Sequence, residues 1–386
     1  MMAKKVIHSL VIALITILLF SSTQLYPQSE EISSDKNKSS SEDILSNNNY
    51  LILGFGYTTG YMISHAKEVV NLRGLNPRTY ELDINWHLNN DNVWNNFQNY
   101  PRVGVFLAFH DFENDDLLGY GFSGGISFTY FFGLPSDFNF HLKGKGGASY
   151  LTKPFDKSKN PQNMAYATHL NYLISVGAGI SFKIQKQMEI QIDGSMNHQS
   201  NAAFLEPNGG INYWAIALST NYFLDQPQFK ERNIPDLYLT SDKKTRWDFS
   251  FSWGISSMPY PLPGQVPMYG LTVLRSWQTW RFVAFTFAAE LERNGRAVEI
   301  TRRINPELDI DPLRASLLGG IDFLMGSTIF SIQIGGYVYR PFVEKDDVYQ
   351  RWGLMYNFYE NIYAGLSFKS YRNSADHLSA RITFSF

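Results

Sequence analysis

The stretch that decides the fold runs from Met188 to Ser200 and has the sequence MEIQIDGSMNHQS. Its first ten residues alternate strictly between two kinds. One set is apolar or small (Met188, Ile190, Ile192, Gly194, Met196), and the other is polar (Glu189, Gln191, Asp193, Ser195, Asn197). Because successive side chains of a β-strand point to opposite faces, this period of two predicts a strand with one apolar and one polar face.

The same alternation recurs from residue 50 to the end of the chain. It predicts strands near 50–63, 78–88, 102–110, 118–133, 137–150, 168–183, 187–199, 211–223, 247–257, 268–276, 280–291, 313–325, 328–340, 349–357, 361–371 and 377–386. The composition agrees, since charged residues make up 18% of the chain and aromatic residues 16%, with a mean hydropathy of −0.22. Strands that are apolar on one side only give this combination of many aromatic residues and moderate hydropathy.

A soluble sandwich would alternate too, with its apolar face turned inward. Three features favour a transmembrane barrel. The polar faces carry both acids (Glu81, Asp83) and bases (Lys143, Lys145), as a polar lumen would. The connections also alternate between long (64–77, 151–167, 201–210, 292–312) and short (134–136, 184–186, 326–327, 358–360), as in outer-membrane barrels, with the exception of 89–101, which is long on the inner side. The last strand, which ends in Phe386, resembles the assembly signal of bacterial outer-membrane barrels.

We therefore predict an all-β fold, an antiparallel transmembrane β-barrel of at least eight and as many as sixteen strands. One large barrel or an eight-stranded barrel followed by a second would both fit, and we favour the single barrel. The predicted domains are a signal peptide at 1–28, a disordered lead-in at 29–49, a first barrel region at 50–225, a linker at 226–246 and further barrel strands at 247–386.

Composition also limits the partners. The net charge of −2 argues against a nucleic-acid partner, and the absence of cysteine excludes disulfides and thiolate metal sites. The apolar run from Val6 to Phe20 follows two lysines, which is typical of a secretory signal peptide. Export and a barrel together predict location in a bacterial outer membrane.

The type of residue changes from apolar to polar where the apolar face of 187–199 ends. His198 and Ser200 follow Met196 on that face, with Cα atoms roughly 6.5 Å apart, which allows a hydroxyl–imidazole hydrogen bond. Asn212 projects from the same face of the next strand. A nucleophile, a base and a group that orients the base could thus converge. Spacing alone leaves open that His198 and Ser200 are only polar residues where a strand enters a loop.

The segments NHQSNA (197–202) and PNGGIN (207–212) resemble the active-site segment of the outer-membrane lipid A 3-O-deacylase family (PagL-like proteins). The family pattern is His-x-Ser-Asn, then Asn-x-Gly, then a third triad residue. The resemblance extends upstream through GASYLTK (147–153) and implies an eight-stranded barrel over about 50–225. It does not cover the chain beyond residue 225.

The resemblance implies an ester hydrolase that deacylates lipid A, with Ser200 as nucleophile and His198 as general base. Asn208, and backbone N–H groups around Asn201, would stabilise the oxyanion. The family typically has Glu at the third position, where this chain has Asn212, which we expect to be the better candidate than Glu206 in the loop. No cofactor and no metal are implied. The expected partner is lipopolysaccharide of the outer leaflet, and a homodimer is left open.

Two alternatives remain at this point. Outer-membrane phospholipase A is similar in having His-x-Ser-Asn and an Asn twelve residues after the Ser, the spacing from Ser200 to Asn212. The other alternative is a non-catalytic barrel, a pore or structural protein. The residues do not identify which acyl chain is cut, nor the role of 247–386.

Overall fold

The computed structural model describes residues 49–386 except 65, 98, 231, 233–244, 281, 309, 326, 343–345 and 372–373. The predicted signal peptide, the lead-in up to residue 48 and most of the linker lie outside the described residues. Each of the two barrels is presented by itself below.

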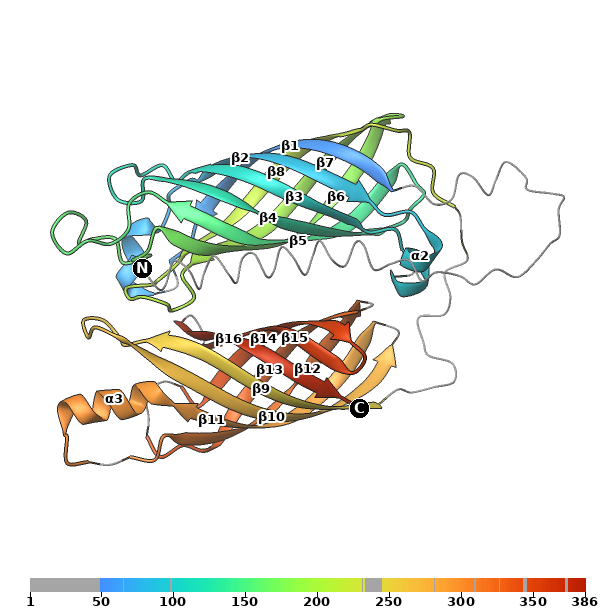
Figure 1. Cartoon of the computed structure of the whole chain (residues 1–386). Coiled ribbons are helices and arrows are strands. Elements are labelled where there is room, and N and C mark those ends of the chain that lie inside the picture. The colour runs from blue at the N-terminus through green and yellow to red at the C-terminus, as the bar shows by residue number, and fades with distance from the viewer. Residues whose placement is uncertain are drawn as a thin grey trace. The chain divides into compact units, whose positions relative to one another are not determined.

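The first barrel consists of eight antiparallel strands in sequence order, and the last strand pairs with the first to close the sheet (Figure 1). Its elements are β1 (Tyr50–Met62), η1 (Lys67–Leu72), β2 (Arg78–His87), α2 (Asp91–Phe97), β3 (Arg102–Asp111), β4 (Tyr120–Phe132), β5 (Phe138–Leu151), β6 (Leu170–Gln185), β7 (Met188–Ser200) and β8 (Ile211–Phe223).

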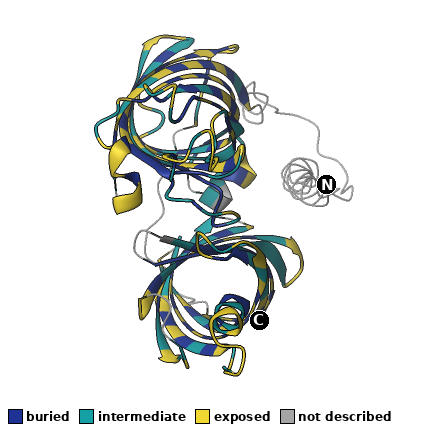
Figure 2. Ribbon diagram, turned by 90° about the vertical axis from the view of Figure 1, so that its left-hand side faces the viewer, coloured by how far each residue is buried: buried dark blue, intermediate teal, exposed yellow. Residues whose placement is uncertain are grey.

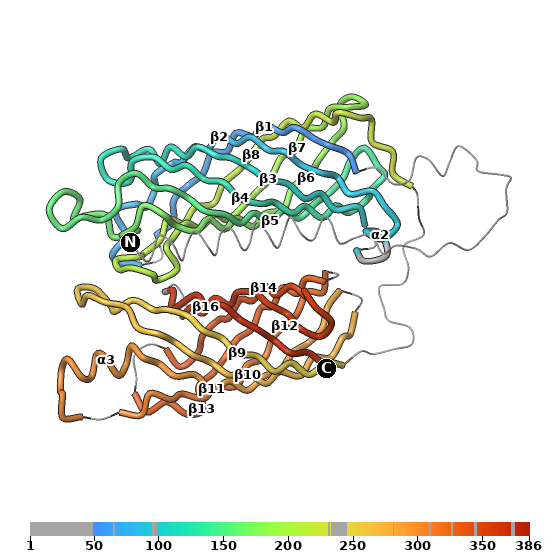
Figure 3. The backbone as a smooth tube through the Cα atoms, in the orientation of Figure 1, coloured from blue at the N-terminus to red at the C-terminus, as the bar shows by residue number. Residues whose placement is uncertain are grey.

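The second barrel repeats this architecture, with β9 paired to both β10 and β16. Its elements are β9 (Thr245–Ser257), β10 (Gln265–Trp280), β11 (Val283–Asn294), α3 (Gly295–Ile304), β12 (Leu313–Met325), β13 (Thr328–Tyr339), β14 (Val348–Tyr359), β15 (Ile362–Tyr371) and β16 (Ser374–Ser385). Figure 3 traces the up-and-down path by which each strand lies beside its neighbours in sequence.

The predicted all-β barrel fold is confirmed, but the preference for one large barrel was wrong. β8 pairs with β1, for example Tyr57 with Leu218, and β16 pairs with β9, for example Phe251 with Ile382. The strand pattern is the same for one large barrel and for two small ones. Which architecture forms depends on the long-range pairing of β1 with β8, which alternation does not encode.

Burial alternates along most of the strands, as the striping in Figure 2 shows. Inward-facing polar residues of the first barrel pair across the lumen: Arg102 donates to Glu189 at 2.9 Å, and His141 lies 2.6 Å from Asp193. Outward-facing residues such as Leu82 and Leu107 are exposed, which suits contact with lipid. No helix among the described residues is long and apolar enough to cross a membrane.

The two ends of the first barrel differ. Long connections at one end span 63–77, 112–119, 152–169 and 201–210, whereas the other end has short turns at 133–137 and 186–187 and one long connection, 88–101, which contains α2. A buried apolar cluster that includes Phe112, Leu118 and Tyr166 lies at the long-loop end. In outer-membrane barrels the long loops are extracellular and the short turns periplasmic. β7 ends and β8 begins at the long-loop end.

Candidate active site

The register of β7 and β8 brings the predicted triad together. His198 lies directly opposite Asn212, and Ser200 follows two residues later on the same face. The imidazole Nδ1 is 2.7 Å from the Asn212 Oδ1, and Nε2 is 2.7 Å from the Ser200 Oγ. An amide oxygen only accepts hydrogen bonds, so Nδ1 carries the proton and Nε2 accepts from the serine hydroxyl. This tautomer is the one that a general base requires.

The cluster lies at the border between an apolar surface and a loop. Tyr172 is opposite Ser200 on β6, and Ile174 is opposite His198. Both side chains are exposed on the outward face, as is Trp214 on β8. Ser200 itself is only 4% exposed, and the backbone of the connection between β7 and β8 contacts its hydroxyl through Ala202. The hydroxyl therefore lies at the edge of an apolar, outward-facing surface.

Asn208 is held in place with its amide donor unused. Its Oδ1 accepts a hydrogen bond from the backbone N–H of Asn201 at 3.0 Å, and its own N–H donates to Glu206 at 2.9 Å. The Nδ2 is buried and has no hydrogen-bond partner among the described residues. A buried donor without a partner costs on the order of 1–3 kcal/mol, so such a group calls for a functional explanation.

Asn201 shapes the loop around Asn208. Its N–H is engaged by Asn208, its Nδ2 donates to the Leu205 carbonyl at 2.7 Å, and its Oδ1 accepts from the N–H of Phe204 at 3.0 Å. The backbone N–H of Ala202 donates to the Ser200 Oγ at 3.4 Å. In this loop the N–H of Asn201 is therefore engaged by Asn208, whereas the N–H of Ala202 points to the serine.

Glu206, the other residue considered for the third position, accepts a hydrogen bond from the backbone N–H of Asn208. The contact with Nδ1 of His198 is made by Asn212, at 2.7 Å. The role of Asn212 as the third residue of a triad stays a prediction.

Gly210 belongs to the Asn-x-Gly motif, but the sequence analysis assigned no role to it. Its φ is +74°, and a Cβ at this position would lie 2.9 Å from the Cε1 of His198. Glycine is therefore needed both for the backbone conformation and for the close approach of the imidazole. Ala202 and Ala203 also have positive φ, 53° and 61°, which marks strain in the loop directly after the nucleophile. The only feature of the sequence that could have indicated this role is the presence of a glycine in the loop motif.

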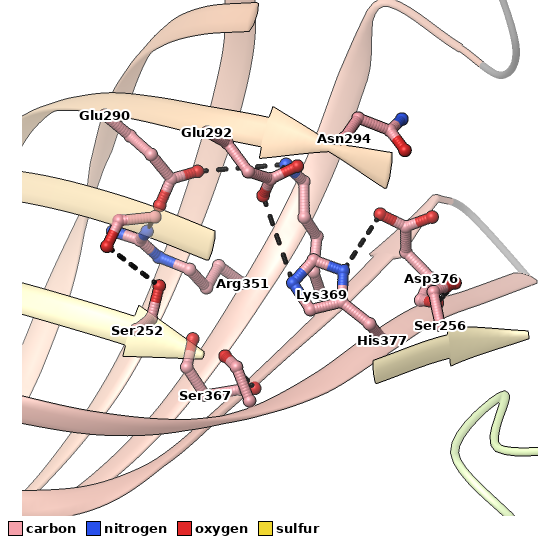
Figure 4. Close-up of polar contacts among 12 residues, drawn as sticks. Ser252, Ser256, Glu290, Glu292, Asn294, Arg351, Ser367, Lys369, Asp376 and His377 are labelled. Carbon is pink, nitrogen blue, oxygen red and sulfur yellow. Dashed lines mark hydrogen bonds and ion pairs between the residues drawn. The ribbon is translucent and has the colours of Figure 1, made fainter. Parts of the chain in front are cut away.

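The second barrel holds a network of charged side chains in its lumen that the sequence analysis also missed. Figure 4 shows Lys369 between Glu290 and Glu292, and His377 between Glu292 and Asp376. Lys369 lies 2.9 Å from Glu292 and 3.8 Å from Glu290. Acids and bases alternate across this lumen and neutralise one another, which makes burial of their charges tolerable. Among the described residues no cluster of His, Asp and Glu could hold a metal ion.

The model of the family "Lipid A 3-O-deacylase (PagL)" matches residues 78–221, and "Acyloxyacyl hydrolase, C-terminal domain" matches residues 245–386. Together they span well over half of the chain. A search of curated proteins finds no match.

Among solved structures, the outer membrane enzyme PagL is 18% identical, with a TM-score of 0.32, and covers 43% of this chain and 97% of its own. Neisserial surface protein A is 9% identical, with a TM-score of 0.30, and covers 45% of this chain and 96% of its own. A mutant of the Rh. blastica porin is 10% identical, with a TM-score of 0.19, and covers 87% and 100%.

Fold and family matches define an outer-membrane β-barrel that hydrolyses a carboxylic ester. More specifically, the chain belongs to the lipid A 3-O-deacylase family, as the sequence resemblance predicted. The protein is thus an outer-membrane lipid A deacylase, and the match at 245–386 extends the relationship into the half of the chain that the resemblance had left uncovered.

Proposed function

We propose that this protein removes an ester-linked acyl chain from lipid A through a serine mechanism carried by Ser200, His198 and Asn212. The family name points to the acyl ester at position 3. The observation that carries the proposal is the continuous hydrogen-bonded series from the Ser200 hydroxyl through His198 to Asn212, with both distances at 2.7 Å.

In this mechanism the Ser200 hydroxyl transfers its proton to Nε2 of His198 as Oγ attacks the ester carbonyl. Negative charge develops on the carbonyl oxygen, which the Nδ2 of Asn208 and the N–H of Ala202 stabilise. His198 then donates its proton to the departing sugar oxygen, which leaves as a hydroxyl group while an acyl-enzyme remains on Ser200. His198 next takes a proton from water, which attacks the acyl-enzyme ester, and returns that proton to the Ser200 Oγ as the fatty acid is released.

The outward-facing residues beside the cluster favour a membrane lipid as substrate. Ile174, Trp214 and Ile216 are exposed on the face from which Ser200 attacks. An acyl chain can stay in contact with this apolar surface while its ester group reaches the loop. Removing that chain from lipid would otherwise cost about 0.8 kcal/mol per CH₂ group.

Mass spectrometry of lipid A from bacteria that express the protein tests this proposal. We expect lipid A to lose one ester-linked acyl chain. Purified protein given phospholipid with and without calcium supplies the comparison, and we expect no cleavage there. Unchanged lipid A together with cleaved phospholipid would instead support a phospholipase. The homodimer stays a prediction, which mass measurement of the protein in detergent tests.

Asn208→Asp is expected to lower kcat by about 10²–10³-fold with little change in KM. The substitution keeps an oxygen that can accept from the Asn201 N–H but replaces the unused donor by an acceptor. Steady-state hydrolysis of purified lipid A measures the effect. Asn197→Asp, on the lumen side of β7, is the matched control, and an equal loss in both variants would contradict a role for Asn208 in oxyanion binding.

Gly210→Ala is expected to lower kcat by on the order of 10²-fold, because a displacement of His198 by about 1 Å misaligns the base. The added Cβ would meet the imidazole at 2.9 Å and strain a φ of +74°. Gly194→Ala on β7, the strand that carries His198, is the control, since its Cβ would have only the Ala178 oxygen within 4.0 Å. Full activity in Gly210→Ala would show that the imidazole position is not critical.

A further inference from the structure

The lipid-facing surface of the second barrel carries a charged residue, Arg275, on β10. The outward-facing positions of β9 and β10 are otherwise apolar, aromatic or uncharged: Thr245, Trp247, Phe249, Phe251, Trp253, Ile255, Gln265, Pro267, Tyr269, Leu271, Val273 and Trp277. A charge on the lipid face of a barrel costs roughly 2–4 kcal/mol at the bilayer midplane, falling to about 0–1 near the interfaces. Its presence therefore calls for an explanation.

Two tryptophans and no carboxylate surround the guanidinium. Arg275 pairs in register with Trp247 on β9 and with Phe287 on β11. The guanidinium carbon lies 4.9 Å from the ring centroid of Trp247 and 6.0 Å from that of Trp277. Among the residues that the structure describes, no acid lies within ion-pair distance of Arg275. Stacking on an indole leaves the N–H edge of the guanidinium available to an anion.

A hollow of about 390 Å³ opens beside the guanidinium, lined by Trp247, Val273, Arg275, Trp277, Phe287, Ala288 and Ala289. Ala289 lies opposite Val273, and because its side chain is small it leaves space between the larger rings. Apart from Arg275, the walls of the hollow are apolar. A ligand that fits must therefore be anionic at one point and hydrocarbon over the rest.

Arg275 lies toward the short-turn end of its barrel. Trp277 and Trp280 follow it, and β11 begins at Val283 after a two-residue turn. Trp247, Trp277 and Trp280 are all exposed on the outer surface, as in the aromatic girdle that marks a membrane interface. The guanidinium therefore lies within reach of the headgroups of the periplasmic leaflet.

We propose that this hollow binds a glycerophospholipid, whose phosphate pairs with Arg275 and whose acyl chains lie against Val273 and Ala289. Guanidinium groups bind phosphate oxygens through paired, charge-assisted hydrogen bonds. The lipid phosphate would therefore supply the counter-charge for Arg275. The site is on the second barrel, whereas the Ser–His–Asn cluster is on the first. It therefore binds lipid without hydrolysing it.

Native mass spectrometry of the full-length protein, released from detergent after exchange with phosphatidylglycerol, tests the site. We expect one retained phosphatidylglycerol in the unsubstituted protein and at least a five-fold lower occupancy in Arg275→Gln. Ala289→Leu keeps the charge but fills the hollow and should lower occupancy as well. Arg293→Gln is the matched control, because Arg293 is an exposed, outward-facing arginine at the loop end of β11.

Lipid A deacylation by each variant shows that the barrels are folded, and it should equal that of the unsubstituted protein. Equal phosphatidylglycerol occupancy in Arg275→Gln and the unsubstituted protein would overturn the proposal. So would an equal loss in Arg293→Gln, or an Arg275-dependent adduct formed with lipid A instead of phosphatidylglycerol. Displacement of the lipid by millimolar inorganic phosphate would mean that the hollow is a site for free anions.

Discussion

Ser200→Ala is expected to lower the rate of lipid A deacylation by roughly 10⁴-fold or more, with substrate binding little changed. Without the hydroxyl, no acyl-enzyme can form, and the remaining groups can only polarise the ester. The side chain of Ser200 is 4% exposed, and the substitution removes one oxygen from it without adding an atom that could clash. The barrel should therefore fold normally. Release of fatty acid from purified lipid A, together with the lipid A mass spectrum of expressing cells, measures the loss.

Ser195→Ala is the control for this experiment, because Ser195 lies on β7 but its position in the alternation faces the lumen. It should retain activity. A fluorophosphonate that reacts with activated serines should label the unsubstituted protein and Ser195→Ala but not Ser200→Ala. Deacylation that persists in Ser200→Ala would exclude Ser200 as the nucleophile.

His198→Gln is expected to cause a loss of similar size, and the double variant with Ser200→Ala should lose little more than either single one. The Ser200 hydroxyl donates to Nε2 at 2.7 Å, so nucleophile and base act as one unit. Removal of either member of such a unit eliminates the same step, and the losses do not add. Rates for the four proteins, measured on the same lipid A preparation, form a double-mutant cycle.

Losses that multiply in the double variant would mean that Ser200 and His198 contribute independently, and the proposed proton transfer would then be wrong. Heat-modifiable migration in gels, which reports barrel folding, should be the same for all four proteins. His169→Gln is a suitable control, because this imidazole is in an exposed position and contacts the Leu151 carbonyl at 2.8 Å.

The strands were predictable from the sequence because their alternation is local. The predicted strand at 187–199 corresponds to β7 at Met188–Ser200, and the predicted strand at 211–223 has the same bounds as β8. Closure into two barrels was not predictable, since it depends on pairing between strands far apart in the chain. The helix α3 was missed because it lies within the connection between β11 and β12. The alternation of the strands indicates only that this connection is long and polar.

The candidate site also has one part that could be predicted from the sequence and one part that could not. His198, Ser200 and Asn212 could be placed together because strand geometry fixes which residues share a face. The contacts inside the 201–210 connection could not be derived, because spacing does not specify loop conformation. Asn201 was expected among the oxyanion donors, whereas its N–H is bonded to Asn208. Gly210 was overlooked because the need for a positive φ depends on how the loop returns to β8.

Asn212 has a consequence for how this protein enters the membrane. With an amide in place of the acid typical of its family, the Ser–His–Asn cluster contains no carboxylate. Its outward-facing neighbours Tyr172, Ile174 and Trp214 are exposed for contact with lipid, where an ionised carboxylate is costly. A cluster without a carboxylate lowers the cost of inserting this part of the strand surface into the bilayer.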